Sequence, residues 1–180
     1  MDRTTIYDHI KSIESNEVKL YSFLYDLIYN EESNDVSFLE KLYSSFLLDD
    51  RSEIKRIAIY ALLFGLKIQK DRYKNFALDN LQDTENDYDL RLTCISGIGQ
   101  AYRNTREPLI LSILSTLYND STEDLNIRAE CFSSMMRVYG LDSKEMVKKN
   151  NCIIVSFEDI EQDNFNDELN NIAVIIEKRV

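Results

Sequence analysis

Residues with the chemistry for catalysis are few in this chain. Its 180 residues include one histidine, His9, and three cysteines, Cys94, Cys131 and Cys152. His9 follows Asp8, but its neighbourhood shows no triad pattern of nucleophile, base and acid, so we interpret it as a surface residue. The cysteines are odd in number and lack CxxC spacing, which argues against both a disulfide framework and a zinc site. We therefore expect no catalytic site, no metal and no cofactor.

Carboxylates are the most abundant chemically active groups, and many of them are clustered. One cluster lies in an expected turn over 83–89, and another lies near the end of the chain over 158–168. Their spacing does not match the calcium loop of an EF-hand. Scattered aromatic residues accompany them, and aromatic rings among carboxylates are typical of protein interfaces. The clusters are therefore either solvated surface or a docking site for a basic partner. The candidate docking residues are Asp83, Glu85, Asp87, Tyr102, Tyr139, Phe157, Glu158, Asp159, Glu161 and Asp163.

The overall charge narrows the class of partner. The chain has 32 acidic against 21 basic side chains, a formal net charge of -11. Phosphate binding depends on clustered Lys and Arg, so this composition disfavours nucleic acid and anionic membrane surfaces. It suits a basic protein, because long-range attraction speeds the encounter. The alternative is that the charge only keeps the protein soluble.

The sequence also carries expectations about location. Its first residues show no apolar signal-peptide core. The longest purely apolar run, over 61–66, is far shorter than the ~20 residues of a membrane helix. Together with the scattered cysteines, these features favour a reducing cytoplasm.

A repeat is visible in the sequence. The segments 53–59, 89–95 and 126–132 align at offsets of 36 and 37 residues. Each begins with a polar residue, an aliphatic residue and a cation, followed by a small residue and then a large apolar one. The small residues are Ala58, Cys94 and Cys131, which we expect to be buried. A weaker copy begins at Glu17.

The pattern inside each copy is helical. Ile54, Ala58, Ala61, Leu62 and Gly65 fall on one stripe of a helix, and the small residues on it let neighbouring helices approach closely. Amphipathic stretches over 36–47, 72–81 and 107–118 lie between the copies, so each unit is a helical pair. A period of 36–37 made of two helices indicates an α-solenoid, and with only four Gly and one Pro the composition disfavours an all-β fold.

The segment 87–99, Asp-Tyr-Asp-Leu-Arg-Leu-Thr-Cys-Ile-Ser-Gly-Ile-Gly, resembles the second helix of HEAT-type repeats, and 124–128 repeats its start. The resemblance covers roughly 15–141. It implies an all-α, short right-handed α-solenoid of about five helical pairs, and it does not identify a partner. We expect one domain over 1–180: an N-terminal capping repeat (1–35), HEAT-like repeats (36–141) and an acidic C-terminal cap (142–180).

One cation per copy, at Lys19, Lys55, Arg91 and Arg128, starts each second helix. These side chains form either a basic ladder that grips an anion or a structural set in which each cation bonds turn carbonyls or acids. We adopt the structural interpretation, because Asp87 accompanies Arg91 just as Asp124 accompanies Arg128.

The functional hypothesis is a non-catalytic protein-binding module. Its most specific form is an acidic immunity or antitoxin-type inhibitor that neutralises a cationic toxin, such as a nuclease, by direct binding. We favour a monomer that contacts neither nucleic acid nor membrane. An adaptor that binds a peptide or helix in its groove is the alternative, and a HEAT-fold lyase or glycosylase is a third hypothesis.

Overall fold

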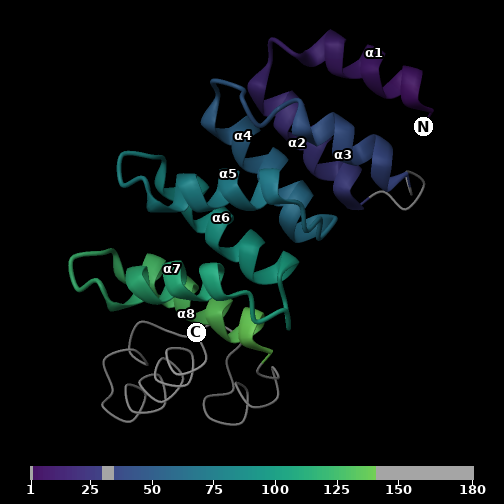
Figure 1. Ribbon diagram of the computed structural model, residues 1–180. Helices are drawn as coiled ribbons and strands as arrows, with labels where there is room; N and C mark the ends of the chain where they lie inside the picture. Colours follow the sequence, from purple (N-terminus) through teal and green to yellow (C-terminus); the bar gives the residue numbers. More distant parts are fainter. Residues whose placement is uncertain (1, 30–34, 141–180) are drawn as a thin grey trace. The chain divides into compact units, whose positions relative to one another are not determined.

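The structure is a computed structural model that describes residues 2–29 and 35–140 (Figure 1). These residues are all-α, as expected, and form no strand. The predicted C-terminal cap, 142–180, lies outside the described residues. The elements are α1 (Arg3–Ile13), α2 (Glu17–Tyr29), α3 (Val36–Ser44), α4 (Ser52–Ile59), the π-helical η1 (Tyr60–Gly65), α5 (Asp71–Gln82), α6 (Tyr88–Ala101), α7 (Pro108–Asn119) and α8 (Leu125–Tyr139).

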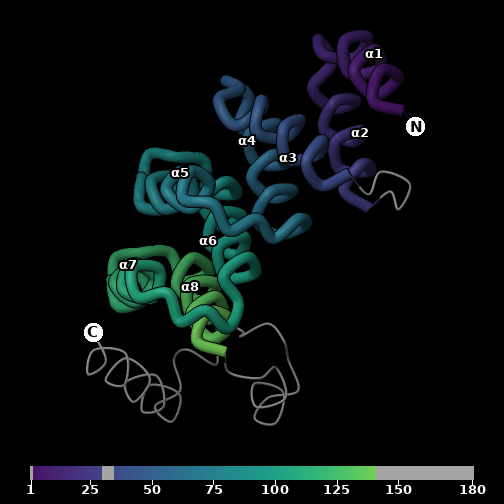
Figure 2. The backbone as a smooth tube through the Cα atoms, turned by 45° about the vertical axis from the view of Figure 1, so that its right-hand side comes forward, coloured from purple at the N-terminus to yellow at the C-terminus, as the bar shows by residue number. Residues whose placement is uncertain are grey.

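The described residues form two compact units that divide between Gly97 and Ile98, and each unit is described by itself. In unit 1, α2 packs against α1, α4 and η1, and α3 packs against α4 and η1. In unit 2, the chain turns back after α7 so that α8 packs alongside it, as Figure 2 shows.

The helices recur at the spacing that the sequence predicts. The second helices α4, α6 and α8 begin at Ser52, Tyr88 and Leu125, with offsets of 36 and 37 residues. The predicted first helices, 36–47, 72–81 and 107–118, correspond to α3, α5 and α7. α3 ends early, at Ser44, and the chain then turns while still burying Phe46 and Leu47.

Acidic side chains explain where several helices begin. Asp2 and Asp35 accept hydrogen bonds from backbone N–H groups in the first turns of α1 and α3. Glu107 and Asp124 do the same for α7 and α8, and Pro108 takes the first position of α7, where no N–H is needed. Part of the negative charge therefore serves the fold, because a carboxylate also complements the positive end of the helix dipole.

Unit 1 has a core of helix faces that present apolar residues every third or fourth position. Leu20, Leu24 and Leu27 of α2 are all buried. Tyr43 of α3 is also buried, and its phenol donates a 2.7 Å hydrogen bond to the carbonyl of Leu24. Burial raises the pKa of Tyr43, so its hydroxyl remains a donor at neutral pH. This bond connects α3 to α2.

The change from α4 to η1 was not predicted. The backbone N–H of Leu66 donates to the carbonyl of Ala61 at 2.7 Å, the five-residue spacing of a π-helix. Four residues of the predicted stripe, Ile54, Ala58, Ala61 and Leu62, are fully buried. The fifth, Gly65, is exposed, because the helix changes to π geometry before reaching it. Such π segments are frequent at functional sites.

Candidate interaction surface

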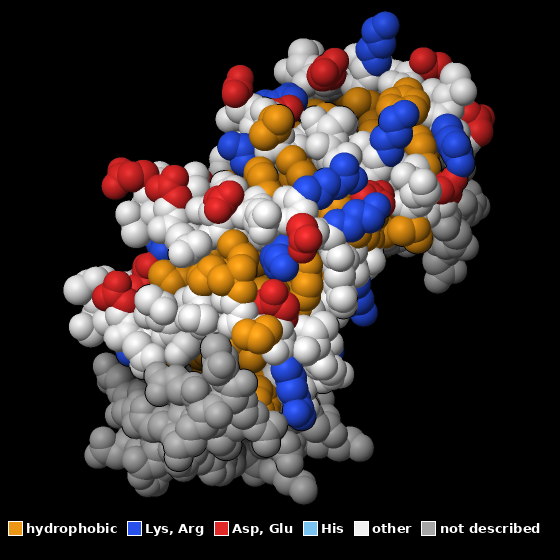
Figure 3. Space-filling view, viewed as in Figure 1, with side chains coloured by type: hydrophobic (Ala, Val, Ile, Leu, Met, Phe, Trp, Pro, Cys, Tyr) orange, Lys and Arg blue, Asp and Glu red, His pale blue; other side chains and the backbone are white. Residues whose placement is uncertain are grey.

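The three described acids of the predicted docking site lie in the turn between α5 and α6. Asp83, Glu85 and Asp87 are exposed, and Figure 3 shows acidic side chains gathered over this turn. Asp83 Oδ1 accepts from the backbone N–H of Glu85 at 3.0 Å, and Asp87 Oδ1 accepts from that of Leu90 at 3.0 Å. Two of the three carboxylates therefore shape the turn and the start of α6 while remaining open to solvent.

The aromatic candidates fall in different environments. Tyr102 is only 6% exposed, so its ring is part of the core and offers no face to a partner in this structure. Tyr139 is half-buried, and the Arg106 guanidinium lies 5.0 Å from its ring centroid. Phe157, Glu158, Asp159, Glu161 and Asp163 lie outside the described residues.

The cation column is structural in the two copies where its bonds are seen. Arg91 Nε donates to the carbonyl of Leu81 at 3.1 Å, and Arg128 Nε donates to that of Tyr118 at 2.8 Å. Both acceptors lie ten residues before their arginine, at the end of the preceding helix. Each guanidinium thus satisfies a carbonyl that the helix end leaves without an intrahelical partner. For Arg91 and Arg128 these bonds support the structural interpretation, with helix-end carbonyls as the acceptors.

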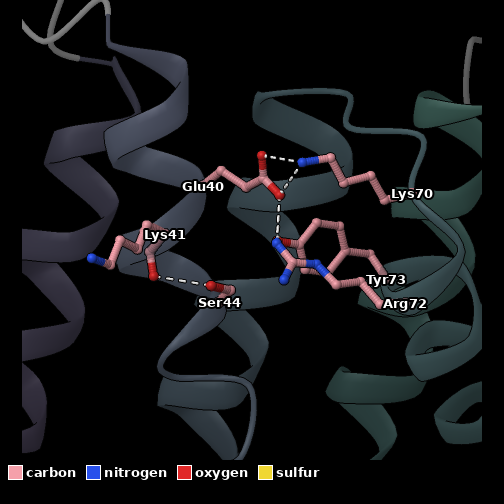
Figure 4. Close-up of polar contacts among 6 residues, drawn as sticks. All are labelled: Glu40, Lys41, Ser44, Lys70, Arg72 and Tyr73. Carbon is pink, nitrogen blue, oxygen red and sulfur yellow. Dashed lines mark hydrogen bonds and ion pairs between the residues drawn. The ribbon is translucent and has the colours of Figure 1, made fainter.

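A cluster of polar side chains joins α3 to the start of α5. Figure 4 shows Lys70, Arg72 and Tyr73 converging on Glu40. Lys70 Nζ lies 2.7 Å from both carboxylate oxygens of Glu40, and the Tyr73 hydroxyl donates to Oε1 at 2.8 Å. Arg72 adds a third donor at 2.5 Å. Beside the cluster, Ser44 Oγ donates to the Lys41 carbonyl within α3 at 2.9 Å.

The environment of Glu40 makes it a structural anchor. The hydrogen bond from Lys70 is the largest cause that lowers the pKa of Glu40 from 4.5 to about 2, and the Tyr73 and Arg72 bonds add to it. Burial, followed by the bond to Glu40, raises the pKa of Tyr73 to about 12. A carboxylate that stays ionised near neutral pH cannot serve there as a general acid. The cluster therefore holds helices together.

The most unusual surface of unit 1 is aromatic. Five rings, defined here as the tyrosine surface, line the outer side of α2 and the adjacent η1. They are Tyr21, Tyr25, Tyr29, Tyr60 and Phe64.

These rings are packed against one another. Tyr25 stacks on Tyr21 and on Tyr60, with centroids 6.4 and 6.5 Å apart and interplanar angles of 16° and 19°. Tyr25 and Tyr29 are 5.1 Å apart and tilted by 51°, and Tyr60 and Phe64 stack at 4.9 Å. The spacing on α2 is four residues, so the three tyrosines share one side of the helix. The result is a continuous set of rings contributed by two elements.

Two members of the tyrosine surface are strongly exposed although they are ordered by contacts. Tyr25 is 41% exposed and Tyr29 is 57% exposed. The hydroxyls of Tyr29 and Tyr60 share a 2.6 Å hydrogen bond. That bond raises the pKa of Tyr29, and a bond with Tyr29 raises the pKa of Tyr25, so both phenols are neutral at physiological pH. The rings are thus held in place before any partner arrives.

Charged groups border the tyrosine surface. The Arg56 guanidinium lies 5.8 Å from the centroid of Tyr21 and forms ion pairs with Glu53 and, at 3.0 Å, with Asp89. Asp26 is exposed beside Tyr25. This combination of stacked rings and carboxylates provides hydrophobic area, aromatic faces for cations and acceptors for donors.

The sequence-based candidates did not include this surface. The signal that reveals part of it is the recurrence of tyrosine at every fourth position of α2, next to the buried leucines. The contribution of η1 has no such signal, because it comes from a distant part of the chain.

No family model, curated protein or solved structure matches this chain. Within 2–29 and 35–140, no helix is long and apolar enough to cross a membrane. The same residues contain no group of three or more His, Cys, Asp or Glu side chains placed to hold a metal ion.

Proposed function

We propose that this chain is a non-catalytic protein-binding module and that the tyrosine surface is its contact site. One observation carries the proposal: Tyr25 and Tyr29 are exposed and yet fixed by stacking and hydrogen bonds. Tyrosine is enriched among the residues that dominate binding energy at interfaces. Because these rings are ordered before binding, this chain loses less conformational entropy when a partner contacts them.

The architecture that we propose for the module is a short right-handed α-solenoid of HEAT-like helical pairs. The recurrence of the second helices at 36 and 37 residues supports it. The matched bonds of Arg91 and Arg128, each to a carbonyl ten residues earlier, also support it. Solenoids of this kind present extended surfaces to their partners.

Within this class, we propose an immunity or antitoxin-type inhibitor that acts in a bacterial cytoplasm on a cationic toxin, such as a nuclease. The net charge of -11 supports this role, because opposite charges speed association and favour a basic partner. The exposed carboxylates of the 83–87 turn would add to the attraction. A general adaptor for a peptide or helix is the second candidate, since the tyrosine surface suits it as well. An adaptor that depends on its rings more than on charge predicts an affinity that changes little with salt.

Affinity capture from the source organism tests the binding function. The bait is the full chain, compared with a Tyr25→Leu/Tyr29→Leu double variant. A matched control carries Tyr7→Leu and Tyr88→Leu, which alter exposed tyrosines outside the tyrosine surface. We expect a protein that the wild type and the control retain and that the double variant loses. A chain that retains no protein, or a partner that all three baits retain equally, contradicts the proposal.

A further inference from the structure

The tyrosine surface contains an internal example of how it accommodates a guanidinium. Arg56 lies over the ring of Tyr21, 5.8 Å from its centroid, while its nitrogen atoms pair with Glu53 and Asp89. The cation is therefore held from below by an aromatic face and from the side by carboxylates. Both interactions are favourable for arginine, whose planar group stacks on rings and donates in its own plane.

Further tyrosine rings and a carboxylate follow Tyr21 along α2, and they are exposed to solvent. Tyr25 stacks nearly parallel to Tyr21, with an interplanar angle of 16°, and exposes 41% of its surface. Tyr29 follows one turn later and exposes 57%. Asp26 is an exposed carboxylate between these two positions in the sequence. An incoming guanidinium thus meets exposed tyrosine rings, and Asp26 is a carboxylate on the same helix.

We propose that the tyrosine surface binds an arginine-bearing segment of the protein partner. This inference rests on the proposed binding function and adds the chemistry of the partner. Charge complementarity supports it, because the whole chain carries a formal net charge of -11. Arginine is favoured over lysine because a compact, strongly hydrated ammonium stacks less well on a ring.

Two synthetic peptides test the inference, and the identity of the partner protein is not needed. One is a blocked peptide of alternating arginine and serine, and the other is its lysine counterpart of equal length and charge. Binding to the full chain is measured at physiological salt by titration calorimetry and by amide chemical-shift mapping. We expect the arginine peptide to bind several-fold more tightly than the lysine peptide and to shift the amides of 17–29 and 60–65.

Substitutions identify the rings responsible. The Tyr25→Leu/Tyr29→Leu variant leaves every formal charge unchanged. We expect it to lower the affinity for the arginine peptide by about tenfold, because two exposed cation–π contacts are lost. The Tyr7→Leu/Tyr88→Leu control removes tyrosines of similar exposure, 46% and 41%, that also stand beside acids, and we expect the wild-type affinity. Tyr25→Phe keeps the aromatic face and should keep the preference for arginine. Circular dichroism checks that each variant is folded.

Several outcomes overturn the inference. A guanidinium site is excluded here if the two peptides bind with equal affinity or if neither binds. It is also excluded if the double variant and the control lose the same amount of affinity for the arginine peptide. A concentration-dependent dimer that the double variant abolishes, seen by light scattering, assigns the rings to a second copy of the chain. None of these results contradicts the proposed binding function, which fails when the chain retains no partner protein.

Discussion

The approach of α6 to α8 in unit 2 gives a sharp prediction at Gly99. A Cβ atom added there would lie 2.4 Å from Ser134 Oγ, 2.6 Å from its Cβ and 2.8 Å from its Cα. The last of these atoms belongs to the backbone, so a change of rotamer does not relieve the clash. Gly99→Ala therefore requires the two helices to move apart.

The expected cost follows from two opposing effects. Overpacking a close contact costs roughly 1–3 kcal/mol or more, while replacing glycine by alanine inside a helix gains about 1 kcal/mol. Because Ser134 is fully buried and the clash reaches its backbone, we place the overpacking cost at the upper end of that range. The net prediction is a loss of about 2 kcal/mol in the free energy of unfolding.

Gly97→Ala is the matched control. Its added Cβ would lie 3.0 Å from Leu63 Cβ, and its other near neighbours are atoms of the same flexible side chain. The gain in helix propensity should offset most of the strain, leaving a change within about 1 kcal/mol.

Urea unfolding followed by circular dichroism measures both variants. Adding Ser134→Gly to Gly99→Ala should restore part of the loss, and a double-mutant cycle isolates the coupling between the two positions. If Gly99→Ala unfolds at the same or a higher urea concentration than the wild type, the inferred close contact between Gly99 and Ser134 is wrong.

Other predictions concern single polar groups and a helix end. Glu40→Gln should lower the free energy of unfolding by about 1–2 kcal/mol. The lowered pKa of Glu40 corresponds to at most about 3 kcal/mol of stabilisation, and solvent screens part of it because Lys70 and Arg72 are exposed. Since that pKa is depressed, the contribution of Glu40 is complete above pH ~4.5 and disappears as the pH falls toward about 2, so urea curves of variant and wild type should converge in acid. Arg128→Met leaves the Tyr118 carbonyl without its donor and should cost about 1–2 kcal/mol in the same assay, whereas the exposed Arg103→Met should change stability by less than about 0.5 kcal/mol. Gly140→Ala places a side chain at φ 86° and 2.7 Å from Asn104 Oδ1, so the melting temperature should fall, with a cost of at least about 1 kcal/mol.

The helices were predictable because their signals are local. The spacing of Ile54, Ala58 and Leu62 and the acid at position 124 each act within a few residues, and the structure buries the first three and caps α8 with Asp124. The similarity of the copies around Arg91 and Arg128 likewise predicted one shared role, which appears as two equivalent bonds to carbonyls.

The surface was harder to predict because it combines distant segments. Tyr21, Tyr25 and Tyr29 show a helical spacing, but Tyr60 reaches them only through packing of η1 against α2 and through a π turn that no local pattern specifies. Tyr102 illustrates the converse problem. A tyrosine next to charged residues has an interface composition, yet its position in the turn directly after α6 places the ring in the core.

The most direct measurement is hydrogen–deuterium exchange of the chain with and without its captured partner. Binding through the tyrosine surface predicts slower exchange over 17–29 and 60–65, while α7 remains unchanged. Protection confined to other segments, with 17–29 and 60–65 exchanging as in the free chain, contradicts the assignment of this surface as the binding site.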